Sequence, residues 1–249
     1  MNESDPLIVP GFRTNMRYRA MRAALLVASS TVLACVALAA LGGRADAASG
    51  PKPGAFRVTL KATVTKDWDT VTEGTDGGCA TSVRSQGRWT ATLRSSKPTP
   101  VVVVFRSGRP VYLPPTVRHV RIRVSQSTRT TTRLLNPCKG RPVHETCAKA
   151  RAAVTGRFMF FRSGRNELSF RPTRLPQLDG ACPSSEQVRA IQPGLEDAQG
   201  RISEAALKNR RVSAQTATGS SRVTTELEGD ETGRVVERVH WDLKFSRVR

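Results

Sequence analysis

Strict alternation of apolar and polar side chains is the feature that most constrains the fold of this chain. In residues 56–65, FRVTLKATVT, every second side chain is apolar, and the pattern returns at 239–245, VHWDLKF. Successive side chains of a strand point to opposite faces of a sheet, so each segment predicts a strand with one buried and one solvated face. Shorter β patterns lie between these two, at 88–94, 101–105, 111–113, 120–124, 158–161, 168–170, 212–218 and 222–227.

About nine strands separated by short turns are typical of an antiparallel β-sandwich, which is the mostly β fold class that we predict. Because Val101 to Phe105 is apolar throughout, we expect that strand to be covered on both faces. We expect a linker at 48–55 and then one sandwich domain over residues 56–249. The alternative is two β modules, 56–135 and 150–249.

Two stretches lack a strand pattern and are expected to be loops. One is the Gly-, Asp- and Thr-rich stretch 69–78, and the other is 136–149, which holds two of the cysteines. Clusters of turn-forming residues between periodic segments are typical of connections at the surface.

The single helical pattern lies near residues 185–209. Apolar side chains recur there at spacings of three and four, and Ser184 with Gln187 forms a capping-box sequence. Pro193 and Gly194 interrupt the run. We therefore predict a short helix before Pro193 and a longer one from about 195 to 209.

Residues 1–47 have the organisation of an export signal. Arg17, Arg19 and Arg22 precede an apolar run over 23–41, and Ala45-Asp46-Ala47 is a signal-peptidase site. We predict a signal peptide cleaved after Ala47, with Met16 as an alternative start of the chain. The apolar run is long enough for a second interpretation, an uncleaved membrane anchor over residues 23–42. In both cases the remainder lies outside the cytoplasm, secreted or in the cell envelope.

The cysteines support an oxidising compartment. Four follow the predicted signal, and an even number in an exported chain predicts two disulfides. Three pairings are possible. We favour Cys138 with Cys147, closing a short loop that contains a glycine and a proline, which leaves Cys79 to pair with Cys182. Zinc binding by Cys138, His144 and Cys147 is the less favoured use of this cluster.

The chain is strongly basic, with 40 Lys and Arg against 20 Asp and Glu. Residues 1–47 hold five arginines and three acids, so the remainder keeps 35 basic and 17 acidic residues. On the predicted strands, Arg121 and Arg123 share a solvated face, as do Arg57 and Lys61. These four residues predict a polyanion-binding surface for an anionic envelope polymer or lipid headgroups; the alternative is an ordinary solvated strand face. Aromatic residues are sparse near it, so no sequence-specific nucleic-acid binding is indicated.

No catalytic constellation is present in the sequence. His144-Glu145 begins a zinc-protease motif, but Ala148 stands where its second histidine belongs. The nucleophile elbow and phosphate-binding loops are missing as well. We expect no catalytic residue, metal or cofactor, and hence a non-catalytic extracytoplasmic protein. The alternative is a secreted hydrolase of cell-wall or extracellular substrates whose residues come from distant parts of the chain.

Overall fold

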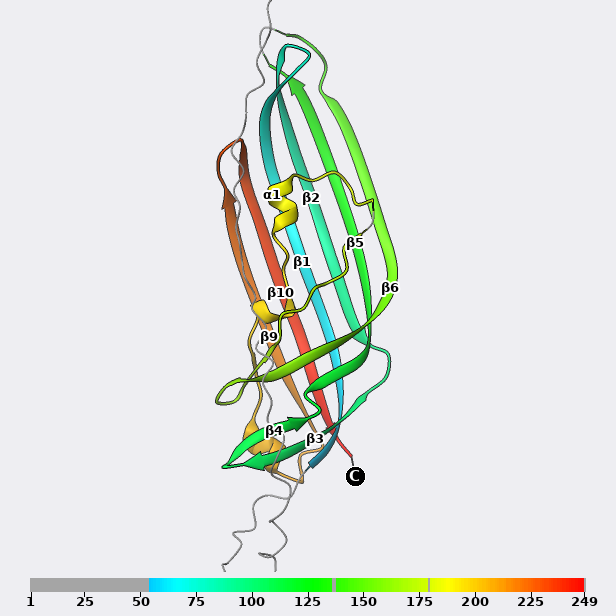
Figure 1. The fold of residues 1–249 in the computed structure, drawn as a ribbon, viewed down its shortest axis with the longest axis vertical. Helices are drawn as coiled ribbons and strands as arrows, with labels where there is room; N and C mark the ends of the chain where they lie inside the picture. Colours follow the sequence, from blue (N-terminus) through cyan, green and yellow to red (C-terminus); the bar gives the residue numbers. More distant parts are fainter. Residues whose placement is uncertain (1–53, 136–137, 179, 249) are drawn as a thin grey trace, which may run out of the picture. The chain divides into compact units, whose positions relative to one another are not determined.

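The computed structural model describes residues 54–135, 138–178 and 180–248, which belong to one compact unit. The predicted signal peptide lies outside the described residues. Ten strands form one antiparallel sheet in the order β10-β9-β8-β7-β6-β5-β2-β1-β3-β4, and β10 also pairs with β1 (Figure 1). The elements are β1 (Gly54–Asp76), β2 (Cys79–Ser95), β3 (Thr99–Arg106), β4 (Arg109–Leu113), β5 (Thr116–Leu134), β6 (Val143–Gly164), β7 (Glu167–Phe170), α1 (Glu186–Ala190), η1 (Leu195–Asp197), β8 (Gly200–Arg201), α2 (Glu204–Lys208), β9 (Ala214–Leu227) and β10 (Glu231–Arg247).

The mostly β, antiparallel, sandwich-like class predicted from the sequence is confirmed. The alternation of β1 holds, because Phe56, Val58 and Leu60 are buried while Arg57 and Lys61 are exposed. On β10, the buried set is Trp241, Leu243 and Phe245. The two sets face the same core, where Phe56 and Phe245 meet edge to face with ring centroids 6.1 Å apart.

The predicted loop at 69–78 is wrong over most of its length, and the one at 136–149 is wrong over its second half. The stretch 69–76 continues β1, because it pairs with β10 as far as Thr72 and with β2 as far as Asp76. Likewise β6 begins at Val143, and its polar first half pairs with the threonine-rich end of β5. Backbone pairing, with β10 and β2 in the first stretch and with β5 in the second, outweighs the turn-forming composition of these stretches. The expectation for Val101 to Phe105 is also wrong, since Val102 is 40% exposed.

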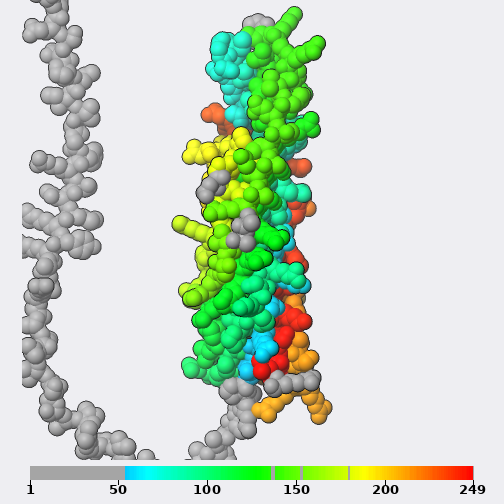
Figure 2. All heavy atoms as spheres, turned by 90° about the vertical axis from the view of Figure 1, so that its right-hand side faces the viewer, coloured from blue at the N-terminus to red at the C-terminus, as the bar shows by residue number. Residues whose placement is uncertain are grey.

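After β7 the chain leaves the sheet and crosses its inner face. Figure 1 shows this covering segment, residues 171–178 and 180–199, passing in front of β1, β2 and β5, and Figure 2 shows it (yellow) on one side of those strands. It contributes Leu178, Leu195 and Ala198 to the core. The concave side of the sheet is therefore covered by a segment with little regular structure.

The helical segment is present but shorter than predicted. Helix α1 is capped by Ser185, one residue later than expected, whose hydroxyl accepts from the Val188 amide. The long helix over 195–209 is wrong: a 3-10 turn, the two-residue strand β8 and helix α2 replace it. Gly200 explains the break, because it pairs with Leu168 and Gly219 in the sheet and a side chain there would overlap the ring of Trp241.

Two disulfides join the four cysteines, but the predicted pairing is wrong. The bonds are Cys79–Cys138 and Cys147–Cys182. Cys147 lies within the extended strand β6, and this directs the chain away from Cys138. Cys138 instead lies beside the β1–β2 turn, where the Leu135 amide donates to the Ala80 carbonyl. The four sulfurs are therefore not zinc-binding thiolates.

No helix among the described residues has the length and apolar character needed to cross a membrane.

Candidate functional site

A groove of about 770 Å³ on the outer face of the sheet gathers the cations that the sequence singles out. It crosses β10, β1, β2 and β5. Its charged lining residues are Lys61, Arg94, Arg121, Arg123, His240 and Asp242. Three of these, Lys61, Arg121 and Arg123, belong to the predicted polyanion-binding set.

The strand register explains why these cations come together. Lys61 on β1 pairs with Arg94 on β2, and Arg94 pairs with Arg121 on β5. Neighbouring strands are about 4.8 Å apart, so the three residues form a row about 10 Å long across the sheet. Arg123 lies two residues further along β5, about 7 Å from Arg121 on the same face. The groove thus presents four basic side chains from strand positions about 5 to 7 Å apart.

These four cations are not held in ion pairs by the described residues, although Asp242 is the register partner of Lys61. Among the described residues, none of Lys61, Arg94, Arg121 and Arg123 forms an ion pair or a side-chain hydrogen bond. The only acid that lines the groove in the described part of the chain is Asp242, which accepts a hydrogen bond from Thr218 at 2.7 Å and lies 3.8 Å from His240 Nε2. The guanidinium donors are therefore free for a ligand.

Further along the same face, arginines are neutralised by aspartates. Arg84 makes a bidentate contact with Asp69, at 2.7 and 2.9 Å, while Arg88 and Arg238 both donate to Asp67. Burial alone would raise the pKa of Asp67, but the two arginines outweigh it and hold the pKa below its usual value. The arginines Arg84, Arg88 and Arg238 are therefore engaged within the protein, in contrast to those of the groove.

We predict that Asp67→Asn lowers the free energy of unfolding by about 0.5 to 1 kcal/mol at neutral pH, the size of exposed ion pairs. Because the folded pKa of Asp67 is depressed, its contribution is present above the unfolded pKa of about 4 and is lost as the pH falls through the folded value. Urea unfolding from pH 7 to pH 2 measures this. Asp76→Asn, on the same strand, is the control, and a difference for Asp67→Asn that stays constant down to pH 2 would contradict the prediction.

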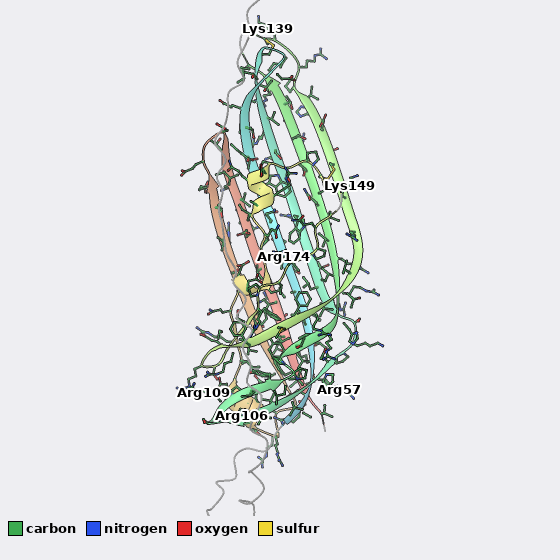
Figure 3. The ribbon with its side chains drawn as sticks, viewed as in Figure 1. Arg57, Arg106, Arg109, Lys139, Lys149 and Arg174 are labelled. Atoms are coloured by element: carbon green, nitrogen blue, oxygen red, sulfur yellow. A yellow bond between two sulfur atoms is a disulfide. The ribbon has the colours of Figure 1, made fainter. Side chains whose placement is uncertain are left out.

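The structure separates one predicted residue from the others. Arg57 is exposed on the outer face of β1, but it lies beside β3 and β10, beyond the end of β2. It is four residues, or about 13 Å, from Lys61. Figure 3 shows Arg57 near the end of the molecule that holds β3 and β4. Arg57 is therefore not part of the groove.

Sequence reasoning missed Arg94 and His240. Both stand at polar positions of alternating strands, so the sequence predicts that their side chains point outward. Their positions opposite Lys61 and Thr63 depend on the register of β2 and β10 with β1, which the sequence does not give. His119 does not line the groove; it has a left-handed backbone, φ 55°, at a register shift of β5. The backbone carbonyl of His119 accepts a hydrogen bond from the Ser96 hydroxyl.

Another residue that the sequence analysis missed, Lys66, lies on the inner face. It occupies an apolar position of the β1 alternation, between Val64 and Trp68, and is 8% exposed. Burial lowers the pKa of Lys66 to about 8, an effect that nearby Glu237 partly offsets. The signal in the sequence was a charged residue in the buried phase of a strand.

Comparisons of the chain with protein-family models, with curated proteins and with solved structures found no match. The assignment of function therefore depends on the geometry and charge of the chain's own residues.

Proposed function

We propose that this protein is a non-catalytic, exported protein of the cell envelope or the extracellular space that binds a polyanion in the outer groove. The observation that carries the proposal is the cluster of four cations on three adjacent strands, none of which forms an ion pair with the described residues. The ligand class is a linear polymer that carries phosphate or another oxyanion at regular intervals, such as an anionic envelope polymer.

The geometry suits a polymer better than a single ion. A row of cations about 10 Å long matches several anionic groups in series, and arginine forks bind oxyanions with two parallel hydrogen bonds. The row runs across the strands and rests on backbone that is hydrogen-bonded on both sides. Ordering the site on binding therefore costs little conformational entropy beyond that of the side chains.

The export part of the proposal is supported by the signal pattern of residues 1–47 and by the two disulfides. Disulfides persist in oxidising compartments and are rare in the cytosol. Both bonds join segments distant in sequence, with separations of 59 and 35 residues. An oxidising, extracytoplasmic location is the setting in which such bonds persist.

The test is binding of the purified protein to long-chain polyphosphate over a range of salt concentrations. We expect log K to fall linearly with log[salt], and the slope to decrease by about one for each phosphate contact removed. Arg121→Ala with Arg123→Ala should therefore weaken binding at low salt and reduce the slope by about two. Arg94→Ala, a residue chosen from the structure alone, should reduce it by about one.

The matched control is Arg129→Ala with Arg133→Ala, which removes the same charge from the same face of the same strand, outside the groove. Retained binding in this control and loss in the groove variant would support the proposal. Equal loss in both double variants would assign binding to net charge alone and contradict it. Equal retention in both would show that polyphosphate does not use the groove.

A further inference from the structure

The inner face of the sheet holds a cavity of about 870 Å³, within the range of small-molecule sites. Its floor is one row of register partners, Lys66 on β1, Trp89 on β2 and Gln126 on β5. Described residues of the covering segment, between Pro172 and Pro193, form the opposite wall. Apolar side chains make up much of the lining, namely Trp68, Trp89, Leu175, Leu178, Val188 and Ile191.

Lys66 is the buried cation of this cavity. Its Nζ donates to the carbonyls of Val188 and Ile191, at 2.7 and 2.9 Å. An ammonium has three donors, so one N–H remains. No carboxylate of the described residues lies within 4.0 Å of Nζ. With a pKa of about 8, Lys66 is mostly protonated at neutral pH. Glu237 on β10, the register partner of Lys66, compensates this charge only in part, because it is not in contact with Nζ. A buried charge without an anion in contact is costly, and an anionic ligand would reduce that cost.

The remaining charged lining residues also favour an anion. Arg174 and Arg189 come from the covering segment, and Figure 3 shows Arg174 on that segment in front of β1. The single acid among the described lining residues, Glu196, already accepts hydrogen bonds from the Thr173 amide, at 3.2 Å, and from its hydroxyl, at 2.9 Å. The described lining therefore contributes three cations and one engaged carboxylate.

We propose that this inner cavity binds a single-chain aliphatic carboxylate, with its carboxylate on Lys66 Nζ and its chain against the two tryptophans and the aliphatic wall. A molecule with one charged end and a flexible apolar body matches one buried cation in an otherwise largely apolar lining. The cavity and the outer groove lie on opposite faces of the same strands. This proposal is therefore independent of polyanion binding.

The test is titration of the protein with dodecanoate below its micelle concentration, followed by tryptophan fluorescence and calorimetry. Trp68 and Trp89 line the cavity, so their emission should change on binding, in step with the heat. Dodecanol and dodecyltrimethylammonium have the same chain with a neutral and a positive head. We expect each to bind about tenfold to a hundredfold more weakly than dodecanoate, the worth of a charge-assisted hydrogen bond. Equal affinity for the three would overturn the proposal.

Variants locate the site. Lys66→Met should weaken dodecanoate binding by about tenfold to a hundredfold, and Lys66→Arg should retain most of it. Lys61→Met is the matched control, since it removes the same charge from the opposite face of β1 and should leave dodecanoate binding unchanged. Equal dodecanoate affinity in Lys66→Met and wild type would overturn the role of Lys66.

A second variant keeps the test decisive if Lys66→Met loosens α1 and does not fold. Leu178→Trp, on the covering segment, narrows the cavity and should weaken dodecanoate binding while leaving Lys66 in place. Unchanged dodecanoate affinity in Leu178→Trp would place the ligand elsewhere and contradict the proposal.

Discussion

Replacing Trp241 with alanine is expected to lower the free energy of unfolding by about 4 kcal/mol, the range for a fully buried aromatic side chain. Trp241 has no exposed surface and packs edge to face on Phe170, with ring centroids 4.9 Å apart. Its ring lies over two glycines of the neighbouring strands, Gly200 and Gly219. Urea unfolding measures the effect. Trp89→Ala, at a half-buried tryptophan, is the control and should cost less.

A double-mutant cycle tests whether the Trp241 ring is the reason that a glycine is required at position 219. A Cβ on Gly219 would lie 2.4 Å from the nearest Trp241 atom, so Gly219→Ala should cost about 1 to 3 kcal/mol by overpacking. In the Trp241→Ala background the same change should cost much less, because the ring is gone. An equal cost of Gly219→Ala in both backgrounds would show that Trp241 is not the reason for the glycine.

Removing the Cys147–Cys182 bond should also lower the free energy of unfolding by a large amount. With a sequence separation of 35, loop-closure entropy gives the bond a worth of about 4 kcal/mol, so Cys147→Ala with Cys182→Ala should lower the free energy of unfolding by about that amount. The bond also ties the covering segment to β6, next to the inner cavity that Cys182 helps to line. We therefore expect dodecanoate binding to weaken in this variant.

The second disulfide provides the control. Cys79–Cys138, with a separation of 59, should have a similar worth for stability, but it joins the β1–β2 turn to the β5–β6 connection and does not touch the cavity. Cys79→Ala with Cys138→Ala should leave dodecanoate affinity unchanged. Mass spectrometry of unreduced peptides tests the pairing itself, and a peptide pair that links Cys138 to Cys147 would contradict it.

Local pattern predicted the fold class and the direction of most side chains. The alternation of β1 and β10 placed Lys61 outside and Trp241 inside, as the structure has them. A side chain's face depends only on the parity of its position in a strand. What the sequence did not provide was register, so Arg94 and His240 were missed although they stand opposite residues of the predicted first strand.

Interactions between distant segments account for the remaining errors. The two carbonyls that hold Lys66 are 122 and 125 residues away from it, on a segment with little regular structure. The disulfide prediction favoured a short loop, but β6 is extended from Val143 onward and Cys147 meets Cys182 instead. The predicted helix over 195–209 is interrupted by β8, where Gly200 packs against Trp241, 41 positions later in the sequence. These contacts join residues that are far apart in the sequence, so a local sequence pattern does not predict the partners.

The pairing of β1 with β10, from Phe56 opposite Arg247 to Thr72 opposite Glu231, has a consequence for the order of folding. The hairpins β1–β2, β5–β6 and β9–β10 are local and can form early, whereas the pairing of β1 with β10 requires the residues between them to be in place. Until then the edge of β1 that faces β10 can pair with strands of other chains. We therefore expect closure of the sheet to be a late step of folding, and one that protects this edge from association with other chains.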